Sequence, residues 1–402
     1  MRRLLLLVPL VACGAPAADE DVGGTTGGVG SSGEATTAST VLASSTASDD
    51  ATADDTAGSS TGGEAPPWEE RGSHGVGVTA LELPGADDRT LRVTVWYPSD
   101  APDGEVGLAE LVAPDQIDTL QGLLDAAPAG CTRPAMEATL DAPLATGTYP
   151  AIVFSHCLSC LGFSSSFVAE RLASHGAIVA GVTHTGDTLF DQLEGNAAPL
   201  NGVWLAVRAE DVALVLDGVL ASSSFGPAID PARIGVFGHS FGAATTGKVL
   251  QDDDRFVAGV ALAAPVENPL LPGVTVAGIA EPMLMLLTRE DNSITEVGNN
   301  LIRSNAMALP GGAWLVELAD AGHWSVSDLC GIVEAFEPGC GDGTRQTAPG
   351  EPFTYLDNEL ARHITASYVT AFFALHLQGD AAAEAYLDAA TPAEVVTVTR
   401  YP

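Results

Sequence analysis

The stretch that decides the fold is Arg233-Ile234-Gly235-Val236-Phe237-Gly238-His239-Ser240-Phe241-Gly242-Ala243. Its first half is an apolar run typical of a buried strand, and the small residues after Gly242 favour a helix. A serine hydroxyl is a weak nucleophile, so it must be held on a sharp turn where a base can reach it. Glycines on both sides permit such a turn. The G-x-S-x-G spacing between a strand and a helix therefore predicts a nucleophile at Ser240.

The sequence around this stretch alternates between apolar runs and helical patterns. Continuous apolar runs, which are typical of strands buried on both faces, occur at 151–154, 177–182, 234–237, 257–262, 283–287 and 314–318. Helices are predicted at 167–175, 202–221, 243–251 and 359–377. Two alternating segments, 76–83 and 91–97, come first and predict paired strands. This order predicts an α/β fold with a mostly parallel central sheet, an antiparallel N-terminal start and helices on both faces.

These segments resemble the α/β-hydrolase superfamily, and within it the platelet-activating-factor acetylhydrolase and dienelactone-hydrolase-like serine esterases. The resemblance covers roughly residues 75–380 and rests on the matched segments 91–98, 150–156, 172–180 and 233–243. It implies the α/β-hydrolase fold and the hydrolysis of carboxylic esters through an acyl-enzyme. Substrates vary widely among such enzymes, so the resemblance indicates the reaction class better than the substrate.

The expected base is His323. In this fold the base follows the nucleophile in chain order, and three histidines follow Ser240. His323 stands in Ala321-Gly322-His323-Trp324, on a loop just after an apolar strand, where its ring can reach over the carboxyl edge of the sheet. His363 and His376 fall in the terminal helix and are expected to pack or to face solvent.

The expected triad acid is Asp291, with Glu290 as the alternative. Both follow the apolar run 283–287, where the resemblance places a carboxylate that orients the base. In acetylhydrolases of the plasma type the acid follows the preceding strand. Here that position is Ala261-Leu262-Ala263-Ala264-Pro265, which offers no carboxylate. This departure shifts the resemblance toward the dienelactone-hydrolase arrangement.

An oxyanion hole needs two backbone N–H groups that point at the developing negative charge. One is expected from Phe241, next to the nucleophile. The other is expected from the loop after Phe154, with the N–H of Leu158 as first choice and that of Cys157 as second. His156 is expected to orient this loop rather than to take part in the chemistry.

Five cysteines remain after Cys13: Cys131, Cys157, Cys160, Cys330 and Cys340. In an exported protein they should pair, and an odd number leaves one free. Cys330 and Cys340 flank a short loop that a disulfide would close. Cys157 and Cys160 could bond to each other, or either could join Cys131. A C-x-x-C without a second matched pair is a weak metal signal, so no metal is expected, and the serine chemistry requires no cofactor.

The N-terminus has the pattern of a bacterial lipoprotein signal. Residues 1–12 hold two arginines and an apolar stretch too short to span a bilayer, and Leu10-Val11-Ala12-Cys13 resembles a lipobox. An ordinary secretory signal is the alternative. Residues 13–66 are rich in Gly, Ser, Thr, Ala and Asp, and predict a flexible acidic linker between an acylated Cys13 and a hydrolase domain at 67–402. We therefore expect export and a lipid anchor on a cell-envelope membrane.

The net charge and two long connections bear on the ligands that this chain can bind. The chain has 402 residues and a formal charge of −36, which excludes non-specific nucleic-acid binding. The expected partner is a small-molecule or lipid ester, with membrane contact only through the anchor. Two long connections, 100–148 and 187–201, are expected to shape the pocket. The alternative from another class is a catalytically silent, hydrolase-like surface protein that only binds.

Overall fold

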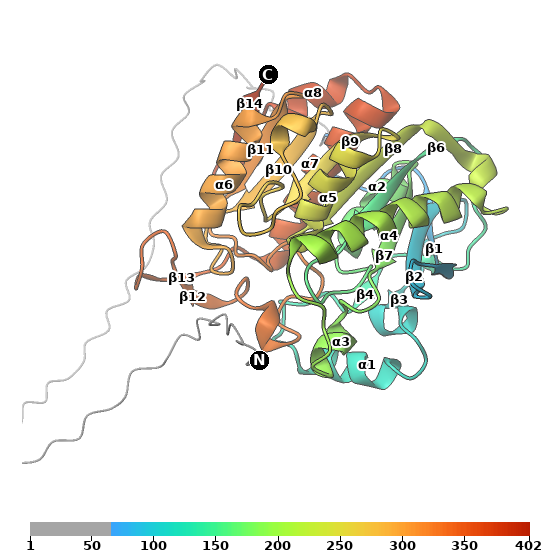
Figure 1. Ribbon diagram of the computed structural model, residues 1–402, viewed down its shortest axis with the longest axis horizontal. Coiled ribbons are helices and arrows are strands. Elements are labelled where there is room, and N and C mark those ends of the chain that lie inside the picture. Colours follow the sequence, from blue (N-terminus) through green and yellow to red (C-terminus); the bar gives the residue numbers. More distant parts are fainter. Residues whose placement is uncertain (1–65) are drawn as a thin grey trace, which may run out of the picture. The chain divides into compact units, whose positions relative to one another are not determined.

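The computed structural model describes residues 66–402, and ten strands form the central sheet of this part (Figure 1). They are β1 (Gly75–Pro84), β2 (Thr90–Ser99), β5 (Thr139–Leu140), β6 (Tyr149–Ser155), β7 (Ile178–Thr183), β8 (Ile229–His239), β9 (Phe256–Leu262), β10 (Met283–Thr288), β11 (Ala313–Leu318) and β14 (Val396–Tyr401). Two small ribbons pair β3 (Val106–Gly107) with β4 (Ala135–Met136) and β12 (Asp342–Thr344) with β13 (Pro352–Thr354).

The sheet has the mixed topology that the sequence predicts. Its strand order is β14-β11-β10-β9-β8-β6-β7-β2-β1-β5. The neighbours from β11 through β7 are parallel, whereas β2 pairs antiparallel with both β7 and β1. The antiparallel edge strand β14 and the short β5 were not predicted. The expected α/β-hydrolase architecture, mostly parallel with an antiparallel start, is confirmed.

Helices cover both faces of the sheet. They are α1 (Ile117–Ala126), α2 (Ser166–Ser174), α3 (Leu189–Leu193), α4 (Gly202–Ala221), α5 (Phe241–Asp252), α6 (Thr295–Ala308), α7 (Asn358–Gln378) and α8 (Ala382–Leu387). Four short 3-10 turns lie at Leu108–Leu111, Gly226–Ala228, Val276–Gly278 and Glu334–Phe336. Figure 1 shows α4, α5 and α6 in front of the sheet. Their apolar residues share one core cluster, and those of α2, α7 and α8 share the other.

Along each central strand, successive side chains point alternately into these two cores. In β8, Val236 packs with the α4–α5 side, whereas Phe237 faces the α2–α7 side and stacks on Phe154 with ring centroids 4.6 Å apart. Both side chains are fully buried. Because a parallel sheet between two helix layers has no solvent face, every position of such a strand must be apolar. That requirement explains the continuous apolar runs in the sequence.

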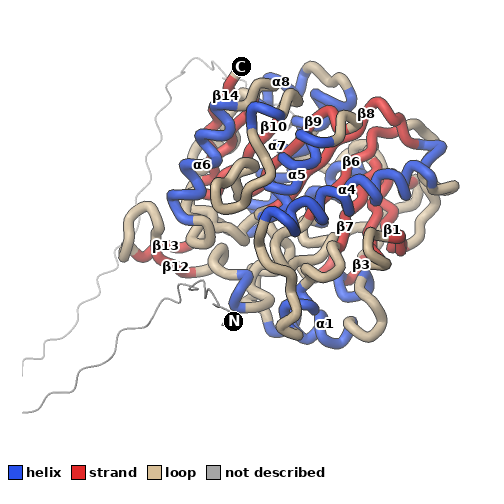
Figure 2. Tube along the Cα trace, in the orientation of Figure 1, coloured by secondary structure: helices blue, strands red, loops and turns tan. Residues whose placement is uncertain are grey.

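The loops at the carboxyl edge of the sheet form the site. Figure 2 shows loops gathered below the central strands, and the segments that follow β8, β10 and β11 carry Ser240, Asp291 and His323. The helices that follow are fixed at their starts, because Asn201 accepts a hydrogen bond from the Trp204 N–H at the start of α4. Asp357 does the same for the Leu360 N–H at the start of α7. Side chains at this edge therefore stand on well-anchored elements.

The disulfide pairing differs from the one expected at Cys330 and Cys340. Cys340 bonds to Cys131, 209 residues away, and Cys330 is the free, buried thiol. The turn before Cys131 packs against the loop after Cys330, since a Cβ on Gly331 would lie 3.1 Å from Pro128. This contact between distant segments could not be seen in the sequence. Cys157 and Cys160 are bonded to each other, as one of the two alternatives expected.

The expected signal peptide (1–12), the lipidated Cys13 and the linker up to residue 65 lie outside the described residues. Within residues 66–402, none of the helices combines the length and apolar character required to cross a bilayer.

Disulfide mapping tests the pairing. Peptides containing Cys131 and Cys340 should be recovered linked, and Cys330 should react with iodoacetamide only after unfolding, because burial raises its pKa to about 11. Replacing Cys131 and Cys340 together with Ser should lower the free energy of unfolding by roughly 2–4 kcal/mol in urea titrations. Cys330→Ala is the control and should lower it by less than the double variant does, because it breaks no disulfide. A recovered Cys330–Cys340 peptide would contradict this pairing.

Candidate active site

Ser240 occupies a sharp turn between β8 and α5. Its φ is 56° and its ψ is −116°, a conformation that L-residues rarely adopt. The flanking glycines are required by contact as well as by conformation. A Cβ on Gly238 would lie 2.0 Å from the Gly242 carbonyl oxygen, and one on Gly242 would lie 1.9 Å from the Ser155 carbonyl oxygen. The two glycines of the G-x-S-x-G pattern are therefore required because no larger residue fits beside the turn that presents the Ser240 hydroxyl.

Two hydrogen bonds bring together the three residues predicted for the triad. His323 Nε2 lies 2.8 Å from Ser240 Oγ, and His323 Nδ1 lies 2.7 Å from Asp291 Oδ2. Asp291 is fully buried. Its other oxygen, Oδ1, accepts the backbone N–H groups of Ser293 and Ile294 at 2.9 and 3.0 Å. These donors hold the carboxylate in the orientation that fixes the imidazole tautomer with Nε2 free to accept a proton.

Glu290, the alternative acid, is directed elsewhere. Its carboxylate pairs with Arg345 at 3.1 Å and accepts the N–H of Gln346 at 2.8 Å. Its backbone N–H donates to the Ala321 carbonyl and so steadies the loop that carries His323. Of the two candidate acids, the structure brings only Asp291 to the histidine.

His239 supports the histidine loop from below. Its Nε2–H donates to the His323 carbonyl at 3.0 Å, and the two rings lie with centroids 5.0 Å apart. Burial, with a smaller contribution from His323, lowers the pKa of His239 to about 3. His239 is therefore neutral at physiological pH and adds no positive charge beside the candidate base.

The candidate oxyanion donors come from the loop after β6 and from the first residue of α5. Leu158 and Phe241 both line the cavity above Ser240, whereas Cys157 is fully buried and does not line it. Among the described residues, the N–H groups of Leu158 and Phe241 make no hydrogen bond. The Cys157–Cys160 disulfide closes this loop, and the Ser159 N–H donates to Asp187 at 2.8 Å. The arrangement favours Leu158, the first choice, over Cys157.

A buried arginine, which the sequence reasoning missed, links both sides of this candidate oxyanion hole. Arg208 of α4 is fully buried and donates to Asp187 at 2.5 Å, as well as to the His156 carbonyl and Ser155 Oγ. Its guanidinium also lies over the Phe241 ring, 4.5 Å from the centroid. Arg208 thus holds the 155–159 loop on one side and Phe241 on the other.

Two histidines complete this buried network. His156 Nδ1–H donates to the Cys157 carbonyl at 2.6 Å, and His156 Nε2 accepts the His184 N–H at 3.0 Å. His184 bonds Ser155 Oγ and the buried Asp211, both at 2.9 Å. Burial and the charge of Arg208 lower the pKa of both histidines well below the usual value. His156 is therefore a neutral loop-orienting residue, as expected from the sequence.

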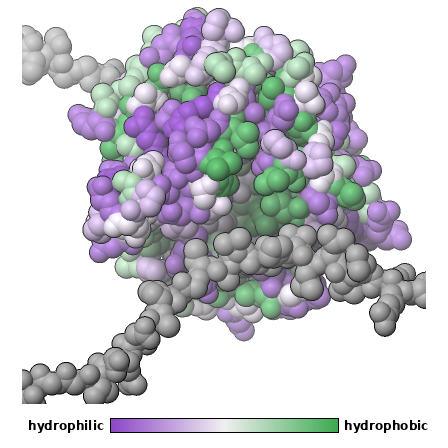
Figure 3. All heavy atoms as spheres, turned by 60° about the vertical axis from the view of Figure 1, so that its left-hand side comes forward, coloured by the Kyte–Doolittle hydropathy of each residue, from purple (hydrophilic) through white to green (hydrophobic). Residues whose placement is uncertain are grey.

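The cavity beside Ser240 is mostly apolar. It has a volume of about 310 Å³, and its lining contains no Asp, Glu, Lys or Arg. Trp324 and Phe336 form one wall and stack with ring centroids 4.3 Å apart. Figure 3 shows the surface of the described part as mainly hydrophilic, with apolar residues gathered beside a hollow on that face. An uncharged cavity in so acidic a protein favours an uncharged ligand.

The two inserts differ in what they contribute. The 187–201 connection supplies Gln192 and Leu200 to the cavity, and Leu200 is 55% exposed at its mouth. The 100–148 connection, expected to shape the pocket, does not line it. It lies behind the wall instead, where Cys131 bonds to Cys340 on the segment that follows Phe336. The 100–148 connection therefore supports the cavity wall from behind and does not contact the ligand space directly.

The sheet order, the turn at Ser240 and the hydrogen-bonded Ser–His–Asp set define an α/β-hydrolase with a serine-type site. The sequence pattern of the family "Platelet-activating factor acetylhydrolase, isoform II" matches residues 66–190 and 203–303. The chain belongs to this family. The matched region contains Ser240 and Asp291 and ends before His323.

Individual relatives agree with this assignment. A platelet-activating factor acetylhydrolase of Cavia porcellus is 28% identical in an alignment of 243 residues that covers 48% of this chain and 53% of that protein. One of Canis lupus familiaris is 33% identical in an alignment of 167 residues that covers 32% of this chain and 38% of that protein. The chain thus matches about half, or less, of the length of these relatives. Among solved structures, a ferulic acid esterase from Streptomyces cinnamoneus superposes with a TM-score of 0.58 at 26% identity, covering 76% of this chain and 91% of that one.

Substituting Arg208 tests its positioning role. Arg208→Gln should slow phosphonylation of Ser240 by a fluorophosphonate by roughly 10–100-fold, because the candidate donors would lose their common support. The matched control is Arg89→Gln, which removes the 2.5 Å ion pair to Asp211 from the same network without touching Phe241 or the 155–159 loop. Equal labelling rates in the two variants, at equal thermal midpoints, would contradict the role.

Proposed function

We propose that this protein is a serine esterase, which hydrolyses carboxylic esters through an acyl-enzyme intermediate. Two hydrogen bonds carry the proposal: Ser240 Oγ–H donates to His323 Nε2 at 2.8 Å, and His323 Nδ1–H donates to Asp291 Oδ2 at 2.7 Å. Membership of the acetylhydrolase family and likeness to a ferulic acid esterase support it. No feature of the described residues favours the alternative of a silent binding protein.

In the proposed reaction, Ser240 Oγ attacks the ester carbonyl carbon while His323 Nε2 takes the hydroxyl proton. Asp291 stabilises the imidazolium that forms. The N–H groups of Phe241 and Leu158 stabilise the oxyanion of the tetrahedral intermediate. His323 then gives its proton to the leaving alcohol oxygen. Water, activated by the same histidine, attacks the acyl-enzyme and releases the carboxylic acid.

The proposed substrates are esters with an uncharged acyl group. The cavity of about 310 Å³ next to Ser240 has no charged side chain to pair with a carboxylate or an ammonium group. Leu158, Ala264, Leu271 and Ile294 instead provide apolar contacts. Transfer of a bare charge into such a site is costly, so a succinyl ester should be a poor substrate compared with a butyryl ester of the same alcohol.

Activity and labelling measurements test the proposal. Wild type should hydrolyse aryl esters and should carry a fluorophosphonate adduct on Ser240, mapped by mass spectrometry. Ser240→Ala and His323→Ala should each lower kcat by about 10⁴–10⁶-fold, as for other serine triads. Thr245→Ala on the same helix is the control variant, since its hydroxyl bonds only the Phe241 carbonyl of its own turn at 3.0 Å. Labelling that persists in Ser240→Ala, or near-normal turnover in His323→Ala, would overturn the assignment.

We further propose that the enzyme is exported and held to a cell-envelope membrane by an acylated Cys13. The lipobox-like Leu10-Val11-Ala12-Cys13 and the acidic, Gly- and Ser-rich stretch up to residue 66 support this. The acyl chains of a lipoprotein supply stable attachment, and the acidic domain is repelled by anionic lipid. Contact with the membrane is then through the anchor alone.

Cys13→Ser tests the anchor. The variant should move from the membrane fraction to the soluble fraction and should keep its specific activity on soluble aryl esters, because Cys13 lies far along the sequence from the catalytic residues. The control is Cys330→Ser, which should stay in the membrane fraction. A soluble wild type whose mature chain begins at another residue would show an ordinary secretory signal instead.

A further inference from the structure

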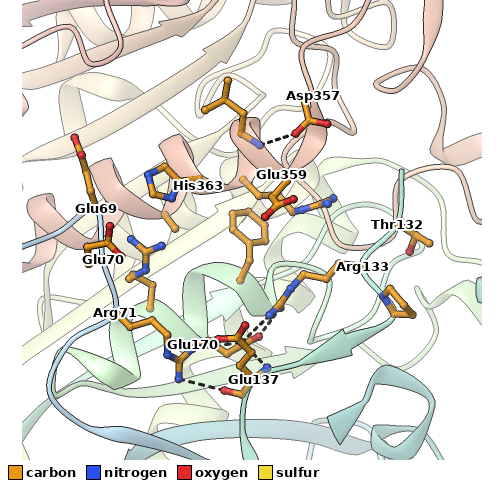
Figure 4. A pocket seen from close by; sticks show the side chains of 16 residues that line it. Glu69, Glu70, Arg71, Thr132, Arg133, Glu137, Glu170, Asp357, Glu359 and His363 are labelled. Carbon is orange, nitrogen blue, oxygen red and sulfur yellow. Dashed lines mark hydrogen bonds and ion pairs between the residues drawn. The ribbon is translucent and has the colours of Figure 1, made fainter. Parts of the chain in front are cut away.

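A second cavity, about 670 Å³ in volume, shares no lining residue with the active-site cavity (Figure 4). Four segments build it: residues 69–71, residues 132–137, helix α2 and the first half of α7. Four arginines line it, Arg71, Arg133, Arg171 and Arg362, and we call it the arginine groove. Its volume lies within the range of roughly 300–1,000 Å³ that is usual for small-molecule sites.

Two of these arginines are already neutralised. Arg133 makes a two-pronged ion pair with Glu170, at 2.6 and 2.8 Å, which is drawn with dashed lines in Figure 4. Arg71 pairs with Asp103 at 2.8 Å and with Glu137 at 3.5 Å. These pairs form fixed walls and leave little positive charge to attract a ligand.

The other two arginines have no carboxylate partner. Although the protein has 52 acidic residues, Arg171 and Arg362 are the only arginines within residues 66–402 that make no ion pair. Both line the arginine groove. A guanidinium left without a counter-charge in a carboxylate-rich protein is unusual, and two in one cavity point to a ligand that supplies the charge.

The geometry of these two guanidinium groups leaves donors free. Arg362 is only 8% exposed, and its Nη1 donates to the carbonyls of Cys131 and Ser327 at 3.0 and 3.4 Å. Arg171 Nη1 donates to the Trp68 carbonyl at 2.8 Å. The Nε and Nη2 atoms of both side chains have no hydrogen-bond partner among the described residues. Burial lowers the pKa of both arginines, which shows that their charge is poorly solvated and only partly offset by Asp328 and Glu70 at longer range.

The rest of the lining defines the kind of ligand. Phe167, Leu360 and Ala366 add apolar surface to the groove. Figure 4 shows Glu359 and His363 on α7, with Glu69 and Glu70 to their left. Acidic side chains around the arginines, together with a net charge of −36, repel polyanions such as nucleic acid. A single anionic group attached to an apolar body satisfies both features.

We propose that the arginine groove is a second ligand site, which binds a small amphiphilic anion: a carboxylate or a phosphate monoester that carries an apolar group. The anionic oxygens take charge-assisted hydrogen bonds from Nε and Nη2 of Arg362 or Arg171. The apolar group covers Phe167 and Leu360. This site is separate from the triad and does not depend on the proposed esterase activity.

Calorimetric titration of the full-length Ser240→Ala protein tests the proposal with four probes. Sodium octanoate and octyl phosphate should bind at sub-millimolar concentration. Inorganic phosphate should bind about tenfold more weakly, because it lacks the apolar part. Octyltrimethylammonium should not bind. The ratio between octanoate and octyl phosphate shows which oxyanion the groove prefers.

Arginine variants locate the binding. Arg362→Gln and Arg171→Gln should weaken octanoate or octyl phosphate at least about tenfold, whereas Arg400→Gln, an exposed and ion-paired control, should leave it unchanged. If Arg362→Gln does not fold, Arg171→Gln and Arg362→Lys decide the question. No heat of binding up to about 10 mM, equal binding of the ammonium probe, or affinity unaltered in the folded Arg171 and Arg362 variants would overturn the proposal.

Discussion

The close approach of α5 to the end of β6 is the constraint on which the site depends. Gly242 lies against the Ser155 carbonyl so closely that a Cβ would be 1.9 Å from that oxygen. This contact places the turn at Ser240 beside the loop that leaves β6, and Phe241 and Leu158 line the same cavity. The positive φ of Ser240 is held by its neighbours: its own N–H bonds the Leu262 carbonyl at 2.9 Å. One crowded turn therefore positions both the nucleophile and the candidate oxyanion donors.

Burying the charge of Arg208 is costly, and its surroundings show how the cost is offset. The guanidinium exchanges water for Asp187, the His156 carbonyl and the face of Phe241. Asp187 in turn fixes the 155–159 loop, because its second oxygen accepts the Ser159 N–H. Hydrophobic residues of similar volume could fill this space without the desolvation cost. They could not fix the direction of a loop whose backbone N–H groups must point at one atom, and this directional requirement is the physical reason for an ionic network below the site.

The parts of the structure that follow from local patterns were predictable from the sequence. Strand periodicity located the central strands, and their common polarity brought Ser240, Asp291 and His323 to one edge of the sheet. Contacts between distant segments were not predictable. Nothing near Cys340 indicates Cys131, and the edge strand β14 has no continuous apolar run. One signal in the sequence could have indicated Arg208: with Asp211, it interrupts the otherwise apolar buried face of the predicted helix 202–221, and both side chains are fully buried. A charged residue on the buried face of a predicted helix is a candidate for a buried ion pair.

The position of the triad acid also affects the cavity. In this chain Asp291 follows β10, so the loop after β9 needs no carboxylate. That loop carries Ala263-Ala264-Pro265, and both Ala264 and Pro265 line the cavity beside Ser240. An acid in this loop would have to be buried against His323 or would face the cavity as a charge. Moving the acid to the next strand keeps the histidine oriented by a fully buried carboxylate and leaves this wall apolar. The position of the acid after β10 thus helps to explain why the cavity is free of charged side chains.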